Sequence, residues 1–193
     1  MYDFYSLYLW EMEKKQTFKV QAGDILNMYT PFSVKKPFSW LSFAIRKVSQ
    51  STWSHSAVVI DIWGRMFICE ALATGIVVRP IEEWGEGAIV CVSRPKTPVD
   101  KKEFSARAMA QVGHKGYDYS SLLWFQLLYQ ITGRWYGHTD ASKKTTERFY
   151  CSEFACWLYQ SYFPKWYETT PQMCHENTKD FEHVYEGEDF SLY

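Results

Sequence analysis

Two apolar runs on either side of residues 63–65 carry the clearest secondary-structure signal in the chain. The runs HSAVVIDI and MFICEAL are rich in β-branched and other apolar residues, and the short Trp-Gly-Arg stretch between them suits a tight turn. This pattern predicts a β-hairpin. The segments GDILNMY, GIVVRPI and AIVCVSR predict three further strands.

Helical periodicity precedes and follows this block of strands. The spacing of apolar residues predicts a helix over 38–50, whose apolar face would hold Phe38, Leu41, Ala44, Ile45 and Val48. Further helices are predicted at 4–14, in KKEFSARAMAQV, in YDYSSLLWFQLLYQITG (capped by Asp118 and stopped by Gly133) and from Cys151 onward. Residues 164–193 are predicted to form an irregular tail. A contiguous block of strands flanked by helices favours an α+β fold with an antiparallel sheet.

The bulk composition narrows the class of protein. A chain of 193 residues with 47% hydrophobic residues is expected to form one folded domain spanning residues 1–193. A net charge of −1 supplies no basic field for nucleic acid or anionic lipid. No apolar run approaches the ~20 residues of a membrane helix, so we expect no stable membrane insertion.

The five cysteines do not form a recognisable framework. Their number is odd and no CxxC pair occurs, so neither a set of disulfides nor a zinc site is expected, and we predict no cofactor. The adjacent pair Cys174 and His175 is too isolated to predict a ligand set. Reduced cysteines and an N-terminal segment without a basic signal-peptide start favour a cytoplasmic location.

Cys151 is the first candidate for chemistry. In CSEFACWLYQSY it begins an apolar stripe that continues through Phe154, Ala155, Leu158 and Tyr162, and this stripe should face the sheet. The free N–H groups and positive dipole at a helix N-terminus favour a thiolate and could hold a developing oxyanion. The alternative is that Cys151 is a small buried residue without chemistry.

The predicted hairpin supplies a base and an acid. His55 begins the first strand, and a two-residue turn would place Glu70 on the same face of the sheet, close enough to orient the imidazole. Asp61 has the same parity but lies ~20 Å along the strand, which excludes it as the orienting acid. The alternative for Glu70, whose charge needs a partner inside an apolar strand, is an ion pair with a basic residue such as Arg79.

Several segments together resemble a known group of proteins. GDIL, STWSHSAVVI, FICEAL, VGHKGYDY and RFYCSEF occur in the order found in the circularly permuted papain-like branch of the NlpC-type superfamily, with YiiX/YebB-like proteins nearest, over about residues 23–182. The resemblance implies a permuted papain-like fold in which an antiparallel sheet packs against the nucleophile-bearing helix. It also implies a Cys151, His55 and Glu70 triad, with Tyr150 and Tyr117 as oxyanion- or substrate-binding residues.

The leading hypothesis is therefore a thiol hydrolase or acyltransferase that acts on an amide or ester bond through an acyl-enzyme. Its substrate could be a small molecule, a peptide or a lipid. Secreted members of the group carry a signal peptide, and its absence here argues against a cell-wall substrate. Two alternatives remain: a non-catalytic lipid- or peptide-binding module on the same fold, and a phage or host-interaction protein that uses the fold as a scaffold.

Overall fold

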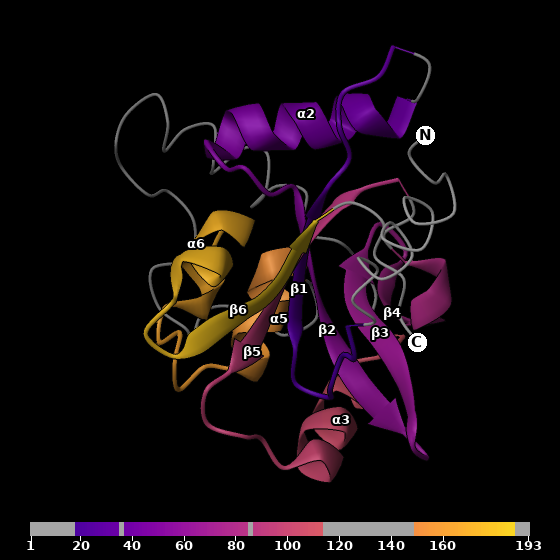
Figure 1. Ribbon diagram of the computed structural model, residues 1–193, viewed down its shortest axis with the longest axis vertical. Helices are drawn as coiled ribbons and strands as arrows, with labels where there is room; N and C mark the ends of the chain where they lie inside the picture. The colour runs from indigo at the N-terminus through magenta and orange to yellow at the C-terminus, as the bar shows by residue number, and fades with distance from the viewer. Residues whose placement is uncertain (1–17, 35–36, 85–86, 114–148, 188–193) are drawn as a thin grey trace, which may run out of the picture.

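A computed structural model describes residues 18–34, 37–84, 87–113 and 149–187 of the chain. In this part of the chain, strands form an antiparallel sheet with the order β4-β3-β2-β1-β5-β6 (Figure 1). The strands of this sheet are β1 (Ile25–Tyr29), β2 (His55–Ile62), β3 (Arg65–Leu72), β4 (Gly75–Pro80), β5 (Ile89–Pro95) and β6 (Phe181–Gly187). The expected antiparallel sheet is confirmed.

Few helices accompany the sheet in the described residues. They are the α-helices α2 (Pro37–Ser49), α3 (Lys101–Met109), α5 (Cys151–Leu158) and α6 (Pro171–Glu176), with the short 3₁₀ helices η1 (Ile81–Glu83) and η3 (Trp166–Glu168). The fold is therefore α+β, as the order of the segments predicts. The helices expected at 4–14 and 118–133 lie outside the described residues.

A two-residue turn joins β2 to β3 and fixes which side chains share a face. Trp63 and Gly64 both have positive φ, 53° and 83°, as a type I′ hairpin turn requires. Val58 pairs with Cys69 across the hairpin. Side chains alternate along each strand, so His55 and Glu70 project from the same face of the sheet.

Both faces of the sheet are covered by apolar side chains. On one face, α3 and α5 pack on β2, around a core that includes Ile25, Val58, Ile60, Phe104, Phe154 and Leu158. The other face carries a second core that includes Leu26, Ala57, Val59, Ile68, Trp84 and Val92. The central strands are therefore buried on both sides, which explains their nearly continuous apolar runs.

The prediction of an irregular tail over residues 164–193 is wrong. Thr170 caps α6 by accepting a hydrogen bond from the Met173 N–H, and Pro171 occupies the first helical position. After α6 the chain returns as β6, which pairs with β5 at the edge of the sheet. The Thr-Pro pair was a usable helix-start signal, whereas the exposed edge strand has no clear alternation of apolar residues.

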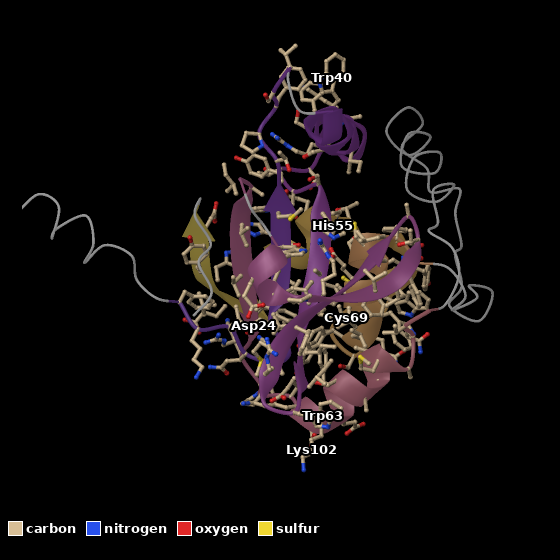
Figure 2. All side chains as sticks on the ribbon, turned by 90° about the vertical axis from the view of Figure 1, so that its right-hand side faces the viewer. Asp24, Trp40, His55, Trp63, Cys69 and Lys102 are labelled. Carbon is tan, nitrogen blue, oxygen red and sulfur yellow. The ribbon has the colours of Figure 1, made fainter. Side chains whose placement is uncertain are left out.

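The apolar face expected for residues 38–50 is only partly found on α2. Ile45 is buried, but Ala44 is exposed, and the small polar residues Ser39 and Ser42 lie on the buried side. The Ser42 hydroxyl lies 2.9 Å from that of Ser54, ahead of β2. The helix is thus attached to the body partly through hydroxyl groups, and this leaves Trp40 54% exposed at the end of the molecule (Figure 2).

Candidate active site

Cys151 is the first residue of α5 and is completely buried. Tyr150 precedes it as the N-cap, and the Glu153 carboxylate accepts a hydrogen bond from the Tyr150 N–H at 3.2 Å. Helix α5 packs on β2 and β3, and its apolar stripe through Phe154, Ala155 and Leu158 is buried. The helix ends at Leu158, so the predicted extension of the stripe to Tyr162 lies in the following turn.

His55 joins Cys151 to Glu70. The histidine begins β2, where it pairs with Met28 of β1, and its side chain is 14% exposed. Its Nε2 lies 2.6 Å from Glu70 Oε2, and the Cys151 thiol is within hydrogen-bonding reach of the ring. Because Nε2 is bonded to Glu70, Nδ1 is the ring nitrogen left for the thiol.

Glu70 is buried on β3 and has three side-chain partners. Besides His55, it accepts a hydrogen bond from Arg79 Nε at 2.7 Å and from Trp84 Nε1 at 3.0 Å. The contact with His55 and the ion pair with Arg79, which the sequence left as alternatives, therefore occur together, because His55 contacts Oε2 and Arg79 bonds to Oε1. The carboxylate is held in place from three sides.

The charges of these groups support one another. Burial alone would lower the pKa of His55, but the charge and hydrogen bond of Cys151, followed by those of Glu70, raise it to about 10. Burial alone would raise the pKa of Glu70, but His55, Trp84 and Arg79 together lower it to about 2. These effects favour a protonated His55 and an ionised Glu70 at neutral pH.

Tyr150 is also completely buried and packs against Ile45 of α2. Its hydroxyl is buried and has no hydrogen-bond partner among the described residues. Burial raises the pKa of Tyr150 above its ordinary value, with the charge of Cys151 among the further causes, so the group remains a donor near the thiol. Tyr117 lies outside the described residues, and so does Asp118.

Trp84 is a component of the site that the sequence patterns did not single out. It directly follows η1 and is almost fully buried, and its indole N–H points to the carboxylate that holds His55. Its ring centre lies 6.5 Å from that of His55. No local sequence pattern predicts this contact. Trp84 follows η1, between β4 and β5, and its side chain meets Glu70 of β3 only when the sheet has formed.

The remaining cysteines differ from Cys151 in their surroundings. Cys156 faces Cys174 of α6, and their sulfur atoms are 2.7 Å apart. Burial raises the pKa of Cys69 and of Cys91 to about 12 in each case. None of the five cysteines forms a disulfide bond, and all of them are buried.

A second cysteine–histidine cluster lies elsewhere on the sheet. Cys91 of β5, His175 of α6 and His183 of β6 bring one ligand atom each to within 4.8 Å of one another. No metal site was predicted from the sequence, because the cysteines show no ligand spacing such as CxxC along the chain. These three residues are far apart in the chain and come from three different elements, so their spacing carries no such signal.

A cavity of about 520 Å³ lies away from the Cys–His–Glu constellation. Its lining includes Trp63 of the hairpin turn and Lys102 of α3. Figure 2 places both residues at the end of the molecule opposite Trp40, whereas His55 lies on the Trp40 side. This cavity is therefore not the pocket of the candidate active site.

The α+β fold and the grouping of cysteine and histidine side chains are compatible with a cysteine hydrolase. Among solved structures, the chain is similar to that titled metalloprotein yiiX from Escherichia coli O157:H7, DUF1105, with a TM-score of 0.52 and 20% identity. The match covers 75% of this chain and 67% of that chain, and it supports a YiiX-like fold. No family model and no curated protein matches the chain.

None of the helices in the described ranges is long and apolar enough to cross a membrane.

Proposed function

We propose that this protein is a cysteine hydrolase or acyltransferase that cleaves an amide or ester bond through an acyl-enzyme. The observation that carries the proposal is the placement of His55, whose ring lies between the Cys151 thiol and the Glu70 carboxylate. Glu70 is held by Arg79 and Trp84 as well, so the imidazole has a fixed orientation.

In the proposed reaction His55 holds the proton shared with Cys151, so that the sulfur reacts as a thiolate. The thiolate attacks the carbonyl carbon of the substrate, and a carbon–sulfur bond forms as the carbonyl oxygen becomes an oxyanion. The N–H groups at the start of α5 and the Tyr150 hydroxyl are the proposed oxyanion donors. His55 then donates its proton to the leaving amine or alcohol, and a thioester on Cys151 remains.

The thioester is resolved by a second nucleophile. Neutral His55 takes a proton from water or from an acceptor alcohol or amine, which attacks the thioester carbonyl. Collapse of the intermediate releases the acid or the new acyl product and returns the proton to the Cys151–His55 pair. Water as the nucleophile gives a hydrolase, and an acceptor gives an acyltransferase.

The chain order supports a permuted papain-like arrangement for this site. The histidine strand β2 precedes the nucleophile helix α5 by about ninety residues of chain, as the resemblance noted in the sequence implies. The likeness to YiiX supports the fold, and the proposal of a papain-like mechanism depends on the three side chains. The cluster of Cys91, His175 and His183 takes no part in any step of this reaction.

One observation favours a second function: a binding module that has the same three side chains but catalyses no reaction. Cys151 is completely buried, whereas reactive cysteines are commonly accessible in part. His55 is partly exposed whereas Cys151 and Glu70 are buried, so a substrate would have to approach from the side of His55. A binding module would hold a lipid or peptide there without forming a covalent adduct.

The test is a substrate comparison with an active-site control. Purified protein and its Cys151→Ala variant are incubated with activated lipid esters and with short peptide amides, and intact mass and product release are measured. We expect an acyl adduct and product with at least one class, both absent in Cys151→Ala. Saturable binding of these compounds with neither adduct nor product would support the binding module and overturn the enzyme proposal.

A further inference from the structure

We propose that Cys91, His175 and His183 form a binding site for a transition-metal ion of the zinc class. This site is separate from the candidate active site, and its existence does not depend on the proposed function. One ligand atom from each residue lies within 4.8 Å of the other two. A thiolate and two imidazoles are a donor set that suits zinc and its neighbours rather than magnesium or calcium.

The sheet register explains why these side chains meet. Ser93 of β5 pairs directly with His183 of β6, and Cys91 lies two residues before Ser93. Because side chains alternate along a strand, Cys91 and His183 project from the same face. Helix α6 runs beside this edge of the sheet and supplies His175 (Figure 1).

Both histidines are already arranged as ligands. His183 Nε2 lies 2.8 Å from the His175 carbonyl oxygen and must donate to it, so the lone pair of a neutral His183 ring is on Nδ1. Such a bond from the second ring nitrogen to a backbone carbonyl is typical of metal-bound histidine. His175 Nδ1 is buried and has no hydrogen-bond partner among the described residues.

The His175 ring is held between two aromatic neighbours. Its centre lies 5.1 Å from that of Trp53 and 4.1 Å from that of His183. A metal ion would satisfy the buried Nδ1 of this ring, which has no hydrogen-bond partner among the described residues.

Two more side chains complete the surroundings of Cys91. Glu186 of β6 is its direct cross-strand partner. Its carboxylate, or a water molecule, could take the fourth ligand position. Asn27 is the partner of Cys91 on β1, and its buried Nδ2 has no hydrogen-bond partner among the described residues, so it could donate to a thiolate.

Metal binding would draw these ligands together slightly. Around a tetrahedral zinc ion with ordinary bond lengths, ligand atoms are about 3.3–3.6 Å apart, so the widest spacing of 4.8 Å must close by about 1 Å. Rotation of the exposed His183 side chain can supply this change. The Cys91 thiol would release its proton as the sulfur–metal bond forms.

The site would join elements that the sequence places far apart. It would attach the edge strand β6 and helix α6 to β5, and α6 also contacts the nucleophile helix through Cys174 and Cys156. Since the unfolded chain does not hold the ligands together, the metal would stabilise the native fold. We therefore assign the metal a structural role.

The experiment uses the full-length protein after treatment with a chelator and dialysis. Zn²⁺ is titrated in competition with a chromophoric chelator, and Co²⁺ is added to a parallel sample for absorption spectroscopy. We expect one equivalent of each metal, a thiolate-to-cobalt charge-transfer band, and a higher melting temperature with Zn²⁺. His183→Ala, at an exposed position, should weaken binding by about tenfold or more, and Cys91→Ser should remove the charge-transfer band.

The control separates this site from the other cysteine–histidine pair. Cys151→Ala should keep the stoichiometry, the band and the shift in melting temperature. Loss of binding in Cys151→Ala with retention in His183→Ala would move the metal to the candidate active site and overturn the proposal. Equally weak binding by the wild type, His183→Ala and Cys151→Ala would also overturn the proposal. The cluster would then be only a stacked pair of imidazole rings beside a buried thiol, without a metal function.

Discussion

At the scale of single residues, the contact with Glu70 affects the orientation and the pKa of His55. The Glu70 carboxylate contacts the imidazole and contributes to the raised His55 pKa of about 10, although Cys151 contributes first. His55 must be protonated to donate to a leaving group, so activity should persist to alkaline pH and fall as the pH rises through about 10. In the proposed reaction Glu70 would therefore be a positioning residue that acts through His55.

Glu70→Gln tests that role. The amide preserves the shape but loses the charge, so the His55 pKa should fall and the alkaline limb of the pH–rate profile should move to lower pH. Activity should decrease by a large factor, but less than in Cys151→Ala. The midpoint of this limb should still lie above about 6.5, the ordinary pKa of histidine, because Cys151 also raises the pKa of His55.

Arg79→Met is the matched control for this substitution. It removes the other charged partner of Glu70 and leaves the bonds from His55 and Trp84 in place. Its alkaline limb should stay close to that of the wild type. If both variants melt at lower temperature and neither moves the limb, Glu70 is only a structural ion-pair partner.

The sequence could predict the His55–Glu70 contact, but not the hydrogen bonds from Arg79 and Trp84 that hold the Glu70 carboxylate. Alternation along the strands and a two-residue turn are local properties, and together they place both side chains on one face. The bond from Trp84 depends on where η1 lies against β3, which no local pattern determines. The register of Arg79 opposite Ile68 likewise follows from the β3–β4 turn.

At the scale of elements, the start of β1 is fitted closely to the end of α5. Gly23 has φ +97°, and a Cβ there would lie 2.6 Å from Val99 Cγ2 and 2.9 Å from Tyr159 Oη. The Tyr159 hydroxyl, just after α5, donates to the Gly23 carbonyl. This turn therefore connects the first strand of the sheet to helix α5.

Gly23→Ala should disturb this junction. It combines an unfavourable backbone conformation with steric overlap, so the free energy of unfolding should drop by about 2–4 kcal/mol in chemical denaturation. Gly64→Ala is the matched control: φ is +83° there too, but no atom lies within 4 Å of the added Cβ, so the loss should be about 1–2 kcal/mol. Equal losses would show that the contacts of Gly23 contribute nothing.

The C-terminal elements show where sequence patterns were too weak. Helix α6 has only six residues and β6 is an edge strand with exposed charges, so neither produces sustained periodicity. Both elements are stabilised by tertiary contacts, through Cys174 and through pairing with β5. This is also why the cluster of Cys91, His175 and His183 was not predicted.

At the scale of the whole molecule, one sheet carries both cysteine–histidine groups. The α+β class follows from the block of strands between helical segments, but the strand order does not. β1 lies between β2 and β5, and β6 returns from the far end of the chain to the opposite edge from β4. The pairing of β5 with β6 places His183 beside Cys91, whereas Cys151 reaches His55 from α5, which packs on β2.

The central claim is that Cys151 is activated by His55, and differential alkylation tests it most directly. Folded protein is treated with iodoacetamide at neutral pH, and the modification of each cysteine is followed by mass spectrometry. All five thiols are buried, so differences in rate should reflect ionisation as well as access. Cys151 should be alkylated well before Cys69, Cys91, Cys156 and Cys174, and His55→Ala should slow its reaction by about tenfold or more while the protein keeps a cooperative melt. Faster modification of another cysteine, or an unchanged Cys151 rate in folded His55→Ala, would contradict the account.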